Sequence, residues 1–208
     1  MIDTRFIDEL ASAAPTPGGG GAAAYCGALA AALASMVGNL TVGKKRYVEV
    51  EDDVRASLDR LDALRAHLVE LVDEDVRAFE PLAAVYRMPK STPEETEARE
   101  RAMQEALVEA CEVPLAIMRA CASVVDECDF LAHEGSRMAV SDAGVAVAFA
   151  RSALLGASLN VYINVRSVSD EERARAYRET ADGLIAGGVA RADAVYAYVA
   201  GELGAATA

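Results

Sequence analysis

The feature that most constrains this 208-residue chain is a stretch without charged residues that extends from Leu10 to Lys44. It contains the turn Pro15-Thr16-Pro17-Gly18-Gly19-Gly20-Gly21 and then an Ala-rich segment that is apolar on every side. The two prolines block helix continuation at the turn, and a long helix over 22–42 is expected after it. A helix without a polar face needs apolar surroundings, so we expect other helices to surround it.

The same stretch is long enough to cross a membrane. However, it consists mostly of Ala and Gly, with Ser35, Asn39 and Thr41 among them, so its drive into hydrocarbon is weak. The opening residues Met1-Ile2-Asp3-Thr4-Arg5 also lack the basic region of a signal peptide. We therefore expect a buried helix in a cytoplasmic protein that contacts no membrane.

The rest of the chain predicts further helices and almost no strands. Apolar residues recur every three or four positions over 48–87, as in a long amphipathic helix. Thr92-Pro93-Glu94-Glu95 combines an N-cap residue, a proline and a capping-box glutamate, and predicts a helix that reaches about Glu127. A short helix over 4–13 and a helix that starts at Ser141-Asp142 are also expected.

A last helix is predicted to follow Ser169-Asp170-Glu171-Glu172, which resembles a second capping box, and to reach about Leu203. The aromatic content is only 5%, which disfavours a β-sandwich. We therefore predict an all-α, multi-helix bundle of five to seven helices with a long buried central helix, in a single domain over 1–208.

The net charge of −13 argues against a nucleic-acid partner, which would require clustered basic residues. An anionic ligand would need a local exception, and Lys44-Lys45-Arg46 is the one tight basic cluster in the chain. The cluster has two interpretations. It either stabilises the C-terminus of the uncharged helix, by about 0.3–1 kcal/mol, or captures a substrate with several carboxylates.

The cysteines and histidines do not predict a metal site. The four cysteines show no CxxC spacing, and the chain has only two histidines. We expect the cysteines to be buried free thiols in a reducing compartment.

Two features of the first half of the chain are candidates for a functional site. The glycines of the turn permit close approach of a ligand to the N–H groups of a helix start, although a tight interhelical turn would also explain them. Asp75 lies on the apolar stripe of its helix, where a carboxylate is costly unless it is paired or functional. The structural alternative for Asp75 is a salt bridge, for example to a lysine of the basic cluster.

The second half contributes three further candidates. Asp142 lies at a helix start, where an acidic residue is favoured by the helix dipole alone, so a functional role stays open. Asn160 and Asn164 lie in an otherwise apolar segment, and buried amides need partners. They are expected to be either interhelical ties or ligand contacts.

Five segments together resemble the methenyltetrahydrofolate cyclohydrolase and formiminotetrahydrofolate cyclodeaminase family. They keep family-like order and spacing over nearly the whole chain. The segments are Ala14 to Gly21, Ala34 to Tyr47, Asp73 to Phe79, Ser141 to Val145 and Leu159 to Asn164. The resemblance implies an all-helical homodimer that acts on the one-carbon unit of a tetrahydrofolate derivative, with no cofactor beyond that substrate and no metal.

Within the family, Tyr47-Val48-Glu49-Val50 and Ala157 to Tyr162 look closer to the cyclohydrolase branch. The implied reaction is hydrolysis of 5,10-methenyltetrahydrofolate to 10-formyltetrahydrofolate. The alternatives are a formiminotetrahydrofolate cyclodeaminase that releases ammonia, and a folate-binding dimer with altered catalysis. The last is motivated by Gly135-Ser136-Arg137-Met138, where the family commonly carries Gly-Asn-x-Asn.

The resemblance also implies roles for the candidate residues. Asp75 or Asp142 would be the general base, and Lys44 or Lys45 the general acid or charge stabiliser. The expected substrate-binding residues are Pro17, Gly18, Gly19, Gly20, Asn39, Arg46, Asn160 and Asn164.

The length of the uncharged helix limits how these residues can meet. About 22 residues span roughly 33 Å, so the glycine turn and the lysines cannot touch one ligand in a straight monomer. If both belong to the site, either a second subunit brings them together or the helix is broken.

Overall fold

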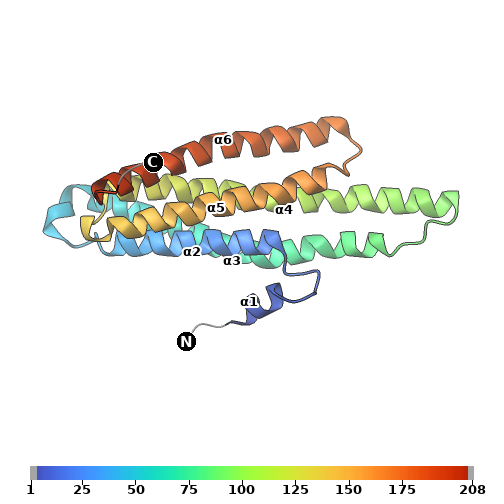
Figure 1. Cartoon of the computed structure of the whole chain (residues 1–208), viewed down its shortest axis with the longest axis horizontal. Helices are drawn as coiled ribbons and strands as arrows, with labels where there is room; N and C mark the ends of the chain where they lie inside the picture. Colours follow the sequence, from blue (N-terminus) through green and yellow to red (C-terminus); the bar gives the residue numbers. More distant parts are fainter. Residues whose placement is uncertain (1–3, 206–208) are drawn as a thin grey trace.

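The computed structural model describes residues 4–205, and every regular element in this range is helical (Figure 1). The predicted all-α bundle is therefore confirmed, with six α-helices in the described part of the chain. These are α1 (Arg5–Leu10), α2 (Gly19–Asn39), α3 (Glu51–Tyr86), α4 (Pro93–Glu134), α5 (Val140–Val165) and α6 (Glu171–Glu202), together with the 3-10 helices η1 (Lys45–Val50) and η2 (Arg137–Ala139).

The ends of the helices test the capping predictions. At the start of α4 the capping box is confirmed, because the Thr92 hydroxyl accepts from the Glu95 N–H at 3.2 Å and the Glu95 carboxylate accepts from the Thr92 N–H at 3.1 Å. At α6 the N-cap is Asp170, whose carboxylate accepts from the Arg173 N–H at 3.0 Å. The predicted capping box at Ser169 is therefore one residue too early.

Several helix bounds differ from the predictions, and two of them concern glycine and proline residues inside helices. Helix α2 begins at Gly19 rather than near Ala22, so three glycines of the turn form the first turn of the helix. Helix α4 continues to Glu134 rather than ending near Glu127, with Pro114 in its interior. Buried neighbours on both helices explain why packing outweighs the low helix propensity of these residues.

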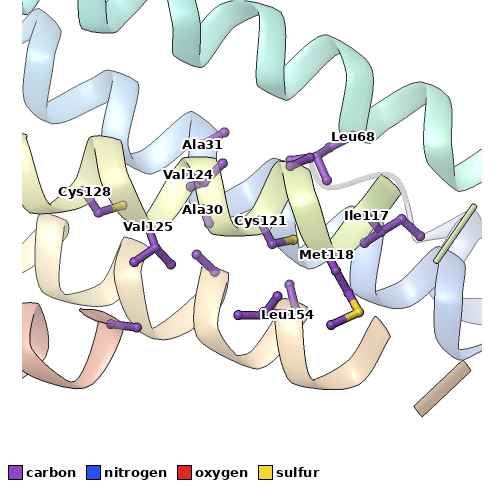
Figure 2. Packing of buried hydrophobic residues seen from close by; sticks show 14 of the residues in the cluster. Ala30, Ala31, Leu68, Ile117, Met118, Cys121, Val124, Val125, Cys128 and Leu154 are labelled. Carbon is purple, nitrogen blue, oxygen red and sulfur yellow. The ribbon is translucent and has the colours of Figure 1, made fainter. Parts of the chain in front are cut away.

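The core lies where α4 passes between α2, α3 and α5 (Figure 2). Small residues on α2 let the helices approach closely, since a Cβ atom on Gly27 would lie 2.8 Å from the Cys121 sulfur. All four cysteines are free, and Cys26 alone is half-buried. Burial raises the pKa of Cys121 and of Cys128 to about 12, so both act as small apolar groups. The labelled core residues are Ala30, Ala31, Leu68, Ile117, Met118, Cys121, Val124, Val125, Cys128 and Leu154.

One side of α2 is largely uncovered by the chain itself, and a ring contact there joins Tyr25 to Phe6 of α1, with the ring centres 5.2 Å apart. The helix packs against α3, α4 and α5, but the expectation that other helices surround it is met on those sides only. On the open side, large apolar residues of α2 and of the neighbouring α5 are exposed. We call this surface the α2–α5 face: Tyr25, Leu29, Met36, Leu40, Val145, Phe149, Leu159 and Ile163. By length and composition alone, α2 and the stretch 137–165 could each cross a membrane, but buried core helices pass the same test.

A buried carboxylate joins α3 to α4. Glu127 is 8% exposed and accepts three hydrogen bonds from α3. The Ser57 hydroxyl donates at 2.7 Å, while Nε and one terminal nitrogen of Arg60 donate at 2.5 and 3.0 Å. A buried charge of this kind is tolerated only because its oxygens are satisfied.

We expect Arg60→Ala to lower the free energy of unfolding by about 1–3 kcal/mol, since it leaves the Glu127 carboxylate buried with only a serine donor. The matched control is Arg101→Ala, which removes the exposed ion pair with Glu97 and should cost less than about 0.5 kcal/mol. Urea unfolding of both variants measures the difference. Equal losses would contradict the structural role given to the Glu127 cluster.

Candidate active site

A cavity of about 330 Å³ lies at the N-terminal end of α2. It is lined by Pro15, Thr16, Gly18, Gly19, Asp75, Ala78, Phe79, Leu82, Tyr86, Ala110, Pro114, Asn160, Ile163 and Asn164. The chain thus brings the glycine turn, the carboxylate of α3 and both amides of α5 to one place. A concave site with apolar walls and a few convergent polar groups is typical of a small-molecule site.

A wider depression of about 850 Å³ lies at the start of α4. It is open to solvent, and its lining runs only from Ser91 to Gln104. The more enclosed cavity, built from three helices and the turn in addition to α2, is therefore the better candidate for chemistry.

Asp75 is held at this cavity by the start of α2. The Gly21 N–H, one of the groups that a helix start leaves unpaired, donates to Asp75 Oδ2 at 2.8 Å. Burial raises the pKa of the Asp75 carboxyl, and the Gly21 hydrogen bond opposes that shift. The expected alternative of a salt bridge to the basic cluster is wrong, because that cluster lies beyond the other end of α2.

Gly20 is the glycine that this arrangement requires. A Cβ atom at position 20 would lie 2.0 Å from Asp75 Oδ1 and 2.5 Å from its carboxyl carbon. Its neighbour Gly19 is different, since a Cβ atom there would meet only the Asn160 amide at 3.7 Å, an ordinary contact distance. The turn therefore does more than reverse the chain, because it lets the Asp75 carboxylate reach the helix start.

The two asparagines combine the roles that the sequence left open. Asn164 Nδ2 donates to the Ala110 carbonyl at 2.6 Å and so ties α5 to α4 while lining the cavity. Asn160 Nδ2 donates to the Gly156 carbonyl in its own helix at 3.2 Å, and its side chain lies beside Gly19. Both amides therefore present polar atoms at the cavity wall.

The structure does not bring the remaining candidates to this cavity. Asn39, Lys45 and Arg46 are exposed at or beyond the far end of α2, and Asp142 lies half-buried in the first turn of α5. Pro17 lines a separate depression with Phe6 and Arg77. The buried Gly20 packs behind Asp75 and is absent from the cavity wall.

The basic cluster does not end α2 as expected. The helix ends at Asn39, and Gly43, with a φ of 75°, turns the chain before Lys44. Lys44 Nζ donates to the Ser136 hydroxyl at 3.2 Å, and the Arg46 guanidinium lies 5.7 Å from the centre of the Tyr47 ring. The interpretation of the cluster as a C-terminal helix cap therefore loses its support.

Several residues of the cavity were not predicted from the sequence. Phe79 and Tyr86, the latter 60% exposed, line the cavity, although neither was among the predicted site residues. The available signal in the sequence was the spacing of Asp75 and Tyr86 along one predicted helix. The two positions are about three helical turns apart, so both side chains lie on one side of α3.

A scan against protein-family models matches residues 3–183 to the formiminotransferase-cyclodeaminase family. The chain belongs to this family. It is 46% identical to a methenyltetrahydrofolate cyclohydrolase of Methylorubrum extorquens over 93% of each chain. It is also 36% identical to the formimidoyltransferase-cyclodeaminase of Mus musculus, where the match covers 82% of this chain but only 32% of the mouse protein.

A solved structure supports the fold. The formiminotetrahydrofolate cyclodeaminase of Thermotoga maritima matches with a TM-score of 0.80 at 30% identity, over 98% of this chain and 96% of the other. The family contains both cyclohydrolases and cyclodeaminases by name, so the fold alone does not choose between the two reactions.

The fit of the glycine turn to Asp75 gives a first prediction for the site. In Gly20→Ala the new methyl group displaces the Asp75 carboxylate and breaks its bond to Gly21, so turnover should fall by about 100-fold or more. The fold should survive, because the displaced group is the end of one side chain. Steady-state kinetics and the thermal unfolding midpoint measure the two effects.

Gly19→Ala is the matched control, since it adds the same methyl group one residue earlier without a clash. It should keep the unfolding midpoint and the Asp75 geometry. A Gly20→Ala protein with full activity would show that the position of Asp75 is unimportant for the reaction.

Proposed function

We propose that this protein is an enzyme that hydrolyses 5,10-methenyltetrahydrofolate to 10-formyltetrahydrofolate in the cytoplasm. No cofactor or metal beyond the folate substrate is needed, and neither nucleic acid nor a membrane takes part. The observation that carries the proposal is the half-buried Asp75 carboxylate, which the Gly21 N–H fixes at the wall of the cavity. The similarity to the cyclohydrolase of Methylorubrum extorquens supports the choice of reaction.

The reaction requires a base and an acid at one carbon. Asp75 accepts a proton from a water molecule while the water oxygen forms a bond to the methenyl carbon. The product of this step is a neutral adduct that carries a hydroxyl group. The adduct then loses its hydroxyl proton, and the bond from that carbon to one of the two folate nitrogens breaks as that nitrogen takes up a proton. The products are the formyl compound and one proton, which Asp75 passes to solvent.

The cavity suits this chemistry in two ways. Partial burial makes the Asp75 carboxylate more basic than an exposed one, which improves proton abstraction from water. Apolar walls at Phe79, Leu82 and Ile163 offer contact area for a flat ring system, while Asn160 and Asn164 offer polar atoms that can orient its nitrogens.

We expect Asp75→Asn to lower kcat/KM at least about 100-fold, and also to stabilise the fold at pH 7. Because burial raises the pKa of Asp75, the folded protein holds this proton more tightly than the unfolded chain. Ionisation at higher pH therefore costs stability, and the neutral amide avoids that cost. The gain in thermal midpoint should vanish below about pH 4, where the wild-type carboxyl is protonated in both states.

The pH dependence of activity has the same origin. The base must be ionised, so wild-type activity should fall as the pH drops through the raised pKa of Asp75. The acid limb of the rate profile should therefore lie above the ordinary aspartate value of 3.8. An acid limb at or below that value would argue for another base.

The direct test follows the loss of the near-ultraviolet absorbance of 5,10-methenyltetrahydrofolate against its spontaneous hydrolysis. Acceleration that Asp75→Asn abolishes supports the proposal. The second candidate is a formiminotetrahydrofolate cyclodeaminase, favoured by the match to the Thermotoga maritima structure. In that reaction a folate nitrogen attacks the formimino carbon and ammonia leaves, so release of ammonia from formiminotetrahydrofolate would identify it.

The third candidate, a folate-binding dimer with altered catalysis, rests on Ser136 and Met138 in place of the asparagines common in the family. Binding of the folate without acceleration of either reaction would support it and would exclude both enzymatic proposals.

We further propose that the active form is a homodimer whose sites are shared between subunits. Helix α2 is continuous over its 21 residues, so Lys44 cannot reach the cavity of its own chain. The exposed apolar α2–α5 face is larger than isolated surface residues would explain and is suited to a second copy.

The direction of the helices supports this arrangement. Asn160 at the end of α5 lies beside the start of α2, so the two neighbouring helices run antiparallel. Consider a twofold axis that passes through the middle of the α2–α5 face and is perpendicular to α2. It would place the Lys44 end of one subunit at the cavity of the other. Lys44 or Lys45 would then act as the acid or charge stabiliser, and Arg46 would attract the glutamate tail of the substrate.

Mixing two strongly impaired variants tests the shared site. Asp75→Asn and Lys44→Ala each remove one part and leave only residual activity, but half of the randomly mixed dimers contain one site with both parts intact. About one quarter of wild-type activity should therefore return after subunit exchange. If each chain carries a complete site, the mixture shows no more than the residual activity of the two variants, and a monomer in sedimentation experiments would contradict the dimer itself.

A further inference from the structure

The segment between α4 and α5 is fixed unusually firmly to the end of α2. Ser136 is 2% exposed, and its N–H donates to the hydroxyl of the fully buried Thr41 at 2.8 Å. Thr41 in turn donates to the Val37 carbonyl of α2 at 2.8 Å. The next N–H, of Arg137, donates to the Tyr47 hydroxyl at 3.0 Å. Two consecutive backbone amides are thus bound by side chains from the segment that carries Lys44.

The close packing around Gly135 explains why this segment has one position. A Cβ atom on Gly135 would lie 2.3 Å from the Leu131 carbonyl oxygen and 3.1 Å from a Val37 methyl group. Glycine is required here chiefly because a Cβ atom would overlap the last turn of α4 itself, and in addition it would crowd Val37 of α2. The Ser136 hydroxyl is therefore held by the backbone on both sides and has little freedom of its own.

This fixed hydroxyl accepts a hydrogen bond from Lys44 Nζ at 3.2 Å. Among residues 4–205 no carboxylate forms an ion pair with Lys44, and the lysine is otherwise exposed. A free lysine side chain loses up to about 2 kcal/mol of conformational entropy when it is ordered. A carboxylate would order the Lys44 side chain but would also neutralise its charge. The neutral, immobile Ser136 hydroxyl orders the side chain and leaves the charge in place.

We infer that Ser136 is a positioning residue, which holds the Lys44 ammonium in place for the cavity of the partner subunit. The inference rests on the proposed function and deepens it, because it adds a residue that acts through Lys44 and touches no substrate. Ser136 lies in the connection between α4 and α5. The structure assigns it a definite contact that keeps the neighbouring lysine oriented.

The first test needs no substrate and therefore does not depend on the proposed reaction. Limiting acetic anhydride modifies lysines, and mass spectrometry gives the ratio of modification at Lys44 to that at the exposed Lys45 of the same molecule. Ser136→Ala should raise this ratio about twofold or more, since Lys44 loses its hydrogen bond. The control Ser35→Ala removes the hydroxyl of a different buried serine, which lies on α2, and should leave the ratio unchanged.

The second test is a double-mutant cycle on kcat/KM. Ser136→Ala should lower kcat/KM about tenfold in the wild-type chain but less than about twofold in the Lys44→Ala chain, because its effect passes through the lysine. Equal losses in both chains, or an unchanged labelling ratio, would overturn the inference. If the wild-type protein catalyses neither folate reaction, the proposed function fails, while the labelling ratio still decides the role of Ser136.

Discussion

The whole site depends on one contact, the hydrogen bond from the Gly21 N–H to Asp75 Oδ2. A helix start leaves several N–H groups without partners, and here a carboxylate from α3 satisfies one of them. The contact exists only because Gly20 lacks a side chain, since a Cβ atom would overlap the carboxylate. The same few atoms therefore join α2 to α3, place Asp75 at the cavity and leave its carboxyl with a raised pKa. Fold and chemistry cannot be separated at this point of the molecule.

The composition of α2 explains the rest of the architecture. Its alanines and glycines present a thin surface, so α3, α4 and α5 pack closely around three of its sides. Its larger apolar residues, such as Leu29 and Met36, point to the remaining side and are exposed in the single chain. A helix that is apolar all round can be read as fully buried in its own chain. In this protein one side of the helix stays exposed in the single chain, and the proposed second subunit would cover it.

Much of this could be predicted from the sequence, because local signals carry it. The capping box at Thr92, the all-α class and the misfit of Asp75 on an apolar stripe all depend on nearby residues. The partner of Asp75 could not be predicted, since it depends on where α2 begins, and four glycines suggest a loop by propensity alone. Tyr86 and Ser136 were missed as contacts for the same reason, because each is brought to its place by helices distant in sequence.

The separation of Lys44 from Asp75 has a consequence for specificity. In a twofold dimer, Ser136 and Lys44 serve the partner's cavity, whereas Asp75, Asn160 and the glycine turn serve their own. In the proposed dimer, one subunit would supply the base and the walls of the pocket, while Lys44 of the other subunit, positioned by its α4–α5 connection, would supply the charge that meets the substrate. We expect substitutions in that connection to change how the one-carbon group is processed without disturbing Asp75. The two reactions named among the relatives differ in which group leaves, and the charge-bearing end is where such a difference can be encoded.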